Sequence, residues 1–145
     1  MTDLEHAQAM RLLARAYHGR SFNIVPLGGD KRPVITGAAT NGKPFRFRWS
    51  DWQAQRQTED AFRAILRPSY WTAVRGVGAI CGPVSGGLAC VDFDSGRKSD
   101  PDAPAIPGDI PAGFLAALGL PADYAWTVRT PGGGWHVWLR CPDLA

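Results

Sequence analysis

Two carboxylates separated by a single residue are the first candidates for chemistry in this chain. Asp92 and Asp94 end an apolar run that begins at Leu88. On an extended strand both carboxylates would lie on one face, about 7 Å apart, with Val91 and Phe93 on the other. A hard divalent cation, Mg²⁺ or Mn²⁺, relieves the repulsion between such carboxylates. The pattern predicts a metal site on a central strand; the alternative is an acidic strand end in solvent.

A second group of candidates lies in the segment Thr-Pro-Gly-Gly-Gly-Trp-His-Val-Trp-Leu-Arg, residues 130–140. On a strand His136 would share one face with Trp138 and Arg140, and the apolar residues between them would face the core. The three glycines, Gly132–Gly134, would let a ligand approach the backbone and leave N–H groups free to face an anion. A hydrogen-bonded structural histidine beside a flexible turn is the alternative.

Basic residues add further candidates for binding phosphate. Arg129 precedes the glycine segment and is expected on the same polar face as His136. Lys31 lies in a turn-rich loop, where it could contact phosphate or remain solvated. Arg46 and Arg48 alternate with aromatic residues, which would suit single-stranded nucleic acid or, equally, a hairpin packed by its own aromatics.

These candidates require a framework of short helices and strands. Apolar spacing, the capping-box spacing of Thr2 and Glu5, and turn residues predict helices over residues 3–18, 58–67 and 111–118, and strands over residues 22–27, 43–49, 77–81, 88–93, 124–129 and 135–141. Asn41-Gly42 indicates a hairpin turn, residues 131–134 indicate another, and residues 97–111 indicate a surface loop. Helices at the start, strands later and no regular β-α-β alternation predict an α+β fold, with one domain spanning residues 1–145.

Composition narrows the class of protein. The 145 residues carry a net charge of +3, and 45% are apolar, which suits one compact core. No apolar run reaches the roughly 18 residues of a membrane span, and no signal-peptide pattern opens the chain, so a cytoplasmic protein without a membrane partner is expected. The three cysteines form no Cys-x-x-Cys pair, which argues against a disulfide framework or zinc ribbon.

Taken in order, these segments resemble the N-terminal primase-polymerase domain of bifunctional replication proteins, a branch of the archaeo-eukaryotic primase superfamily. The resemblance rests on Tyr-His-Gly-Arg-Ser-Phe-Asn-Ile-Val-Pro-Leu (17–27), Gly-Asp-Lys-Arg-Pro (29–33), Gly-Ala-Ile-Cys-Gly (78–82), Ser-Gly-Gly-Leu-Ala-Cys-Val-Asp-Phe-Asp (85–94) and Val-Arg-Thr-Pro-Gly-Gly-Gly-Trp-His (128–136). The ordered set covers nearly the whole chain and is more specific than Asp-x-Asp alone.

The resemblance implies an archaeo-eukaryotic primase-like core, with a largely antiparallel or mixed sheet that carries the Asp-x-Asp and histidine strands. It implies template-directed nucleotidyl transfer as a DNA primase or polymerase, in replication of a phage, plasmid or other mobile element. Asp92 and Asp94 would hold Mg²⁺ or Mn²⁺ and, with His136, act in catalysis. The residues implied to bind nucleotide phosphates are His136, Arg129, Thr130, Gly132, Gly133, Gly134 and Lys31. Nucleoside triphosphates, template DNA and a downstream helicase domain or partner are the implied partners.

Two departures from the family pattern matter. Gly132 stands where a small polar residue is usual, and only backbone donors remain there. The family's third carboxylate has no counterpart, because Asp143 follows the histidine strand too closely. The chain is therefore expected to be incomplete at its C-terminal end, before the third acidic motif, and an inactive fragment stays an alternative to an active one.

Two other functions stay open at this point. A primase-like fold could bind a nucleotide or single-stranded DNA without turnover. Asp-x-Asp-x-Gly after an apolar strand also resembles the motif of haloacid-dehalogenase-type phosphatases, with Asp92 as nucleophile and Asp94 as acid or base. That fold needs a parallel β-α-β array and a later lysine, and Lys98 is the one lysine that follows.

Overall fold

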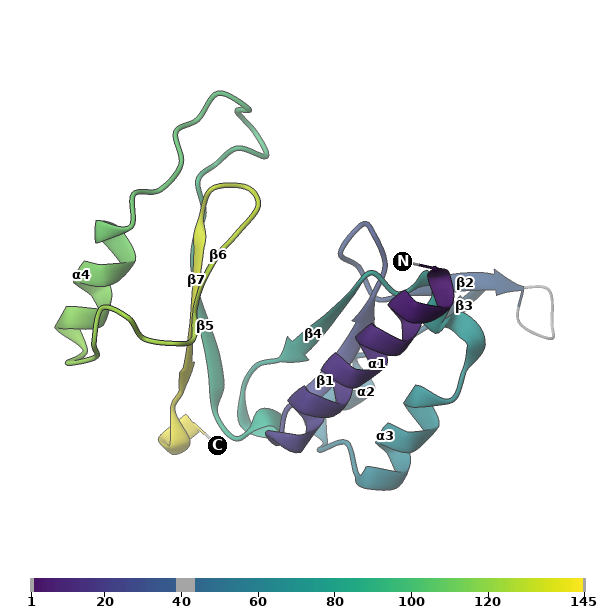
Figure 1. Cartoon of the computed structure of the whole chain (residues 1–145). Coiled ribbons are helices and arrows are strands. Elements are labelled where there is room, and N and C mark those ends of the chain that lie inside the picture. Colours follow the sequence, from purple (N-terminus) through teal and green to yellow (C-terminus); the bar gives the residue numbers. More distant parts are fainter. Residues whose placement is uncertain (1, 39–43, 145) are drawn as a thin grey trace. The chain divides into compact units, whose positions relative to one another are not determined.

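The computed structural model describes residues 2–38 and 44–144, which form two compact units (Figure 1). The first unit comprises Met1–Leu88 and Cys141–Ala145, and the second comprises Ala89–Arg140. The chain leaves the first unit after Leu88 and returns at Cys141, whose backbone N–H donates to Gly87 O at 2.8 Å.

The first unit is built on helix α1 (Asp3–Gly19) and an antiparallel pair of strands, β1 (Asn23–Leu27) and β4 (Gly76–Ile80) (Figure 1). The capping box expected from the sequence forms, because Thr2 and Glu5 satisfy each other's backbone N–H groups. Ala7 and Ala14 are fully buried, and their small side chains let α1 approach its neighbours closely.

The remaining elements of this unit are short. They are β2 (Ile35–Ala38), β3 (Pro44–Arg46), α2 (Asp51–Ala54), α3 (Glu59–Leu66), and 3-10 helices at Ser69–Ala73, Pro83–Ser85 and Pro142–Leu144. β2 and β3 pair antiparallel, whereas the predicted Asn41-Gly42 turn lies outside the described residues. Thr58 caps α3, where its hydroxyl accepts from Ala61 N, and Phe62, Ile65 and Leu66 turn inward.

Two buried amide side chains close the outer edge of β1. Gln57 Nε2 donates to Ile24 O at 2.9 Å, and Ile24 N donates to Gln57 Oε1 at 2.8 Å, so one side chain substitutes for a neighbouring strand. Asn23 Oδ1 accepts from Gln57 N and Arg56 Nη1, and its Nδ2 donates to the Trp52 and Gln55 carbonyls. This network fixes the segment after α2 to the sheet without a further strand.

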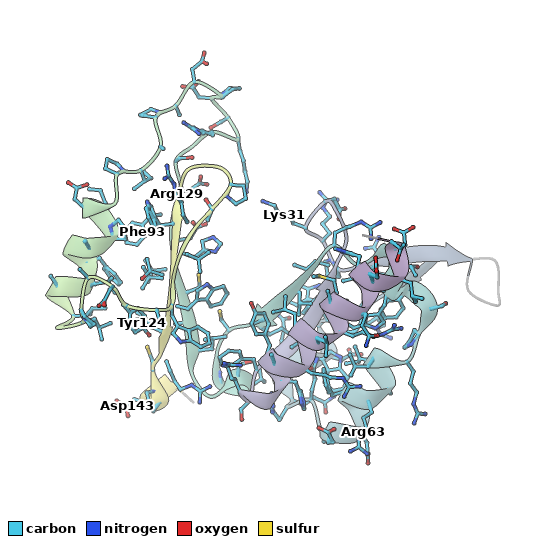
Figure 2. The ribbon with its side chains drawn as sticks, in the orientation of Figure 1. Lys31, Arg63, Phe93, Tyr124, Arg129 and Asp143 are labelled. Carbon is cyan, nitrogen blue, oxygen red and sulfur yellow. The ribbon has the colours of Figure 1, made fainter. Side chains whose placement is uncertain are left out.

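The second unit is a sheet with one helix on it. The strand order is β5 (Leu88–Phe93), β7 (Trp135–Arg140) and β6 (Thr127–Arg129), and α4 (Asp109–Ala117) follows β5 in the chain. Phe93 of β5 points towards α4 (Figure 2) and meets Phe114 edge-on, with ring centroids 5.6 Å apart. Val137 and Leu115 are almost fully buried. α4 therefore covers one face of this sheet.

The α+β prediction is confirmed, and most predicted elements form within a residue or two of their expected limits. β4 and β5 belong to different sheets. The chain nevertheless reverses between them, because Gly82 forms an antiparallel bridge with Leu88 at the start of β5. Within the described residues, no helix is both long and apolar enough to span a bilayer.

Candidate active site

The Asp-x-Asp strand and the histidine strand lie side by side in the second unit. β5 and β7 run in opposite directions. Gly87, just before β5, is hydrogen-bonded to Cys141, just after β7, and Phe93 at the end of β5 lies against Gly134, just before β7. This register brings Asp92 Oδ1 to 3.5 Å from His136 Nε2. The Asp92 side chain is 59% exposed and that of His136 is 36% exposed, so both are open to solvent.

Both acidic side chains are accessible, and Asp92 lies on the face opposite α4. Phe93, between them in the chain, packs on Phe114, which confirms that its side chain faces away from Asp92. Asp94 is the first residue after β5, and its Oδ1 accepts from Gly96 N at 3.0 Å. That hydrogen bond fixes one carboxylate oxygen of Asp94, and the residue as a whole is exposed.

His136 lies on the central strand of this sheet. The sequence-based expectation that the Asp-x-Asp strand is central is wrong, because β7 lies between β5 and β6. The His136 ring meets Trp138 edge-on, with centroids 6.1 Å apart, so these residues share a face as predicted. Val128 is paired with His136 across β6 and is 49% exposed. The site is thus an open sheet face with acidic, imidazole and aromatic groups.

The glycine segment forms the predicted hairpin turn between β6 and β7, but its hydrogen bonding differs from the expectation. Gly133 N donates to Thr130 O and Gly134 N donates to Thr130 Oγ1, both at 3.0 Å. The expectation that the glycine amides are free to face an anion is therefore wrong for Gly133 and Gly134. Thr130 Oγ1 is likewise used inside the turn. Gly132 O accepts from Ser95 Oγ at 2.6 Å, which ties the turn to the loop after Asp94.

Arg129 is not on the His136 face. It pairs with Trp135 across β6 and β7, and its guanidinium lies over the Trp135 ring, 5.8 Å from the centroid. Residues paired across antiparallel strands point to the same face, so Arg129 lies on the side that carries α4 (Figure 2). The expectation from strand alternation is wrong because the register, which the sequence did not specify, decides the pairing.

Three basic candidates, Lys31, Arg46 and Arg48, belong to the first unit. Lys31 is exposed in the loop after β1, with a left-handed backbone at φ 61°. Arg46 and Arg48 are both exposed, and Arg48 lies 3.7 Å from Asp51. Phe47 is buried, whereas Trp49 is 41% exposed. These residues remain candidates for nucleic-acid contact.

Comparison with known families agrees with the resemblance seen in the sequence. The family model Prim-Pol, described as bifunctional DNA primase/polymerase, N-terminal, matches residues 14–145. The chain belongs to this family. Neither the curated proteins nor the solved structures include one with significant similarity to the chain. Membership in the Prim-Pol family supports nucleotidyl transfer of the primase/polymerase type, with nucleotides and DNA as substrates.

The donor set suits the divalent ion that the Prim-Pol family implies. Within the described residues, no group of three or more His, Cys, Asp and Glu side chains is placed to hold a metal ion. Mg²⁺, however, typically binds one or two protein carboxylates and completes its shell with water and substrate phosphates. The exposed carboxylates of Asp92 and Asp94 fit that mode of binding.

Sequence reasoning missed two residues that shape the site. Ser95 joins the loop after Asp94 to the glycine turn, and Arg97 lies against Gly133 of the same turn. The sequence predicts a surface loop over residues 97–111, so Arg97 begins this loop and Ser95 lies just before it. Their position directly after Asp-x-Asp was the available signal.

Proposed function

We propose that this chain carries out template-directed nucleotidyl transfer with Mg²⁺ or Mn²⁺, using Asp92, Asp94 and His136. The observation that supports this most is the approach of Asp92 and His136 on an open sheet face, in a chain of the Prim-Pol family. Acidic ligands for a cation and a donor for phosphate are the groups that phosphoryl transfer requires.

The protein's part in the reaction is to position charge. Asp92 and Asp94 supply carboxylate oxygens to the cation, and the hydrogen bond from Gly96 N holds Asp94 in place. When bound, a divalent ion lowers the pKa of a primer 3′-hydroxyl and neutralises triphosphate charge. His136 Nε2, next to the carboxylates, donates to a phosphate oxygen of the incoming nucleotide. The glycine turn fixes the start of β7 and hence the position of His136.

The wider setting of the reaction also belongs to this proposal. We propose replication of a phage, plasmid or other mobile element as the context, with a helicase domain or partner downstream. Template DNA would be bound through basic and aromatic surface, without dependence on base sequence.

The sequence leaves two alternative functions open, a phosphatase and a binding module without turnover. The phosphatase alternative gains no support, because the pairs β1–β4, β2–β3 and β6–β7 all run antiparallel, whereas that fold needs a parallel β-α-β array. A module that binds nucleotide or single-stranded DNA without turnover has the same open face and remains the second candidate.

Primer extension by the full chain, with Mg²⁺ or Mn²⁺, tests the proposal. Asp92→Asn and Asp94→Asn keep side-chain shape and remove charge, so both should abolish incorporation while the circular dichroism spectrum is unchanged. Asp123→Asn is the matched control, because Asp123 is an exposed aspartate in the turn before β6. Incorporation that survives both substitutions contradicts the assignment. Nucleotide binding without incorporation in the unsubstituted chain would favour the binding module.

A second measurement separates the role of His136 from that of the carboxylates. His136→Ala should weaken nucleotide binding more than primer-template binding, because the imidazole contacts phosphate of the nucleotide. An equal loss of both affinities, or of neither, argues against that contact.

A further inference from the structure

The second unit needs basic side chains at defined positions if it is to hold a triphosphate. Ala89–Arg140 contains six aspartates against four lysines and arginines, so its net charge is negative. An unspecific basic surface cannot attract a polyanion there. Two of the three glycine amides are also used within the turn. Besides His136, the second unit offers four basic side chains that could meet the phosphates.

Three of these four side chains are poorly suited. Arg129 stacks over Trp135 on the face that carries α4. Arg140 ends β7, at the end of the strand opposite the glycine turn. Lys98 is exposed, and among the described residues it has no hydrogen bond or ion pair that would fix its direction.

Arg97 differs because its guanidinium is both exposed and held in place. Its Nε donates to Ala103 O at 2.7 Å. Its Nη1 lies against the glycine turn, 3.1 Å from the point where a Cβ on Gly133 would be. Gly133 has a φ of 80°, and the missing side chain leaves room for the guanidinium. Within the described residues, Arg97 forms no ion pair with a carboxylate, so its charge is not neutralised.

The same contacts place Arg97 at the end of the sheet that carries the site. Arg97 follows Asp94 by three residues, and Gly133 precedes His136 by three residues. Three residues of extended chain span roughly 10 Å, so Arg97 is within that reach of Asp94, and Gly133 is within that reach of His136. Ser95 joins the two segments through Gly132 O. A nucleotide whose phosphates start at His136 would extend towards this turn.

We propose that Arg97 binds the terminal phosphates of the incoming nucleoside triphosphate and so selects triphosphates over monophosphates. This rests on the proposed function, because it places a phosphate contact beside the glycine turn that precedes His136. Nε donates to Ala103 O and Nη1 lies against Gly133, so the N–H groups of Nη1 and Nη2 that point away from the turn are left to donate to phosphate oxygens. Preorganisation by Ala103 reduces the side-chain entropy lost on binding.

Binding measurements on the full chain test this proposal. The probes are a deoxynucleoside triphosphate, the matching monophosphate and inorganic tripolyphosphate, each titrated in the presence of Mg²⁺. Arg97→Gln should weaken triphosphate and tripolyphosphate binding by roughly 10- to 100-fold, the size of a lost charged hydrogen bond. Monophosphate binding should change by less than about threefold. Lys98→Gln removes the adjacent charge and is the matched control, with all three affinities nearly unchanged.

The outcomes separate this role from a structural one and from the proposed function. An equal loss for triphosphate and monophosphate, together with a lower melting temperature, would mean that Arg97 only fixes the loop. An unchanged triphosphate preference in Arg97→Gln also overturns the proposal, as does an unsubstituted chain that binds no tripolyphosphate. If tripolyphosphate binding depends on Arg97 while primer extension is absent, the polymerase function fails and the phosphate site stands.

Discussion

Replacing Gly134 by alanine tests whether the glycine turn sets the distance between β5 and β7. A Cβ at this position would overlap the carbonyl oxygen of Phe93 and lie 3.3 Å from Thr130 Oγ1. Because the overlap is with backbone, the strand that carries Asp92 must move away from the strand that carries His136. Overpacking of this kind costs about 1–3 kcal/mol. For a chain of this size the melting temperature should fall by roughly 3–10 °C.

The same displacement of β5 from β7 should cause a large loss in the rate of nucleotide incorporation, although the melting temperature falls by only a few degrees. A shift of about 1 Å between catalytic groups can cost on the order of 100-fold in rate. Gly132→Ala is the matched control, since a Cβ there would meet nothing within 4 Å. Thermal unfolding followed by circular dichroism and primer extension should be measured for both variants. If Gly134→Ala melts at the same temperature as Gly132→Ala, the strand spacing does not depend on this glycine and the reasoning is refuted.

Three further predictions concern stability and binding. Gln57→Ala should lower the free energy of unfolding by about 2–5 kcal/mol, because it leaves Ile24 N and O unpaired, whereas the exposed Gln55→Ala should change it by under about 0.5 kcal/mol in urea titrations. Burial raises the pKa of Tyr70 to about 12, against about 10 in the unfolded chain, so stability should fall as pH rises from about 10 to 12. Tyr70→Phe should flatten that fall in urea titrations at successive pH values, and an equally steep fall would contradict the assignment. The logarithm of the affinity for single-stranded DNA should decrease linearly with the logarithm of salt concentration, and a salt-independent affinity would exclude phosphate contacts.

Local sequence signals predicted the elements well. The capping box at Thr2 and Glu5 and the hydrophobic run into Asp92 depend on neighbours in the chain, and both appear as expected. The shared face of His136 and Trp138 also follows from alternation alone. Alternation within one strand is a local property, which is why these predictions are confirmed.

Properties that depend on pairing could not be predicted in this way. Whether Arg129 joins His136 depends on the register between β6 and β7, and one residue of shift reverses the face. The use of Gly133 and Gly134 amides depends on the turn's own hydrogen bonds. Gln57 acts on β1 from 33 residues away, with no local pattern to indicate it. The metal and the individual roles of Asp92, Asp94 and His136 stay predictions.

The meeting of Gly87 and Cys141 has a consequence for how this chain can be cut and rejoined. The second unit starts and ends next to the hydrogen bond from Cys141 N to Gly87 O. A side chain on Gly87 would overlap Cys141 O. A segment whose ends are adjacent can be removed, replaced by a short linker or exchanged for a related segment without redirecting the host chain. Ala89–Arg140 is thus a natural unit for grafting, and Gly87 is the residue that such a graft must retain.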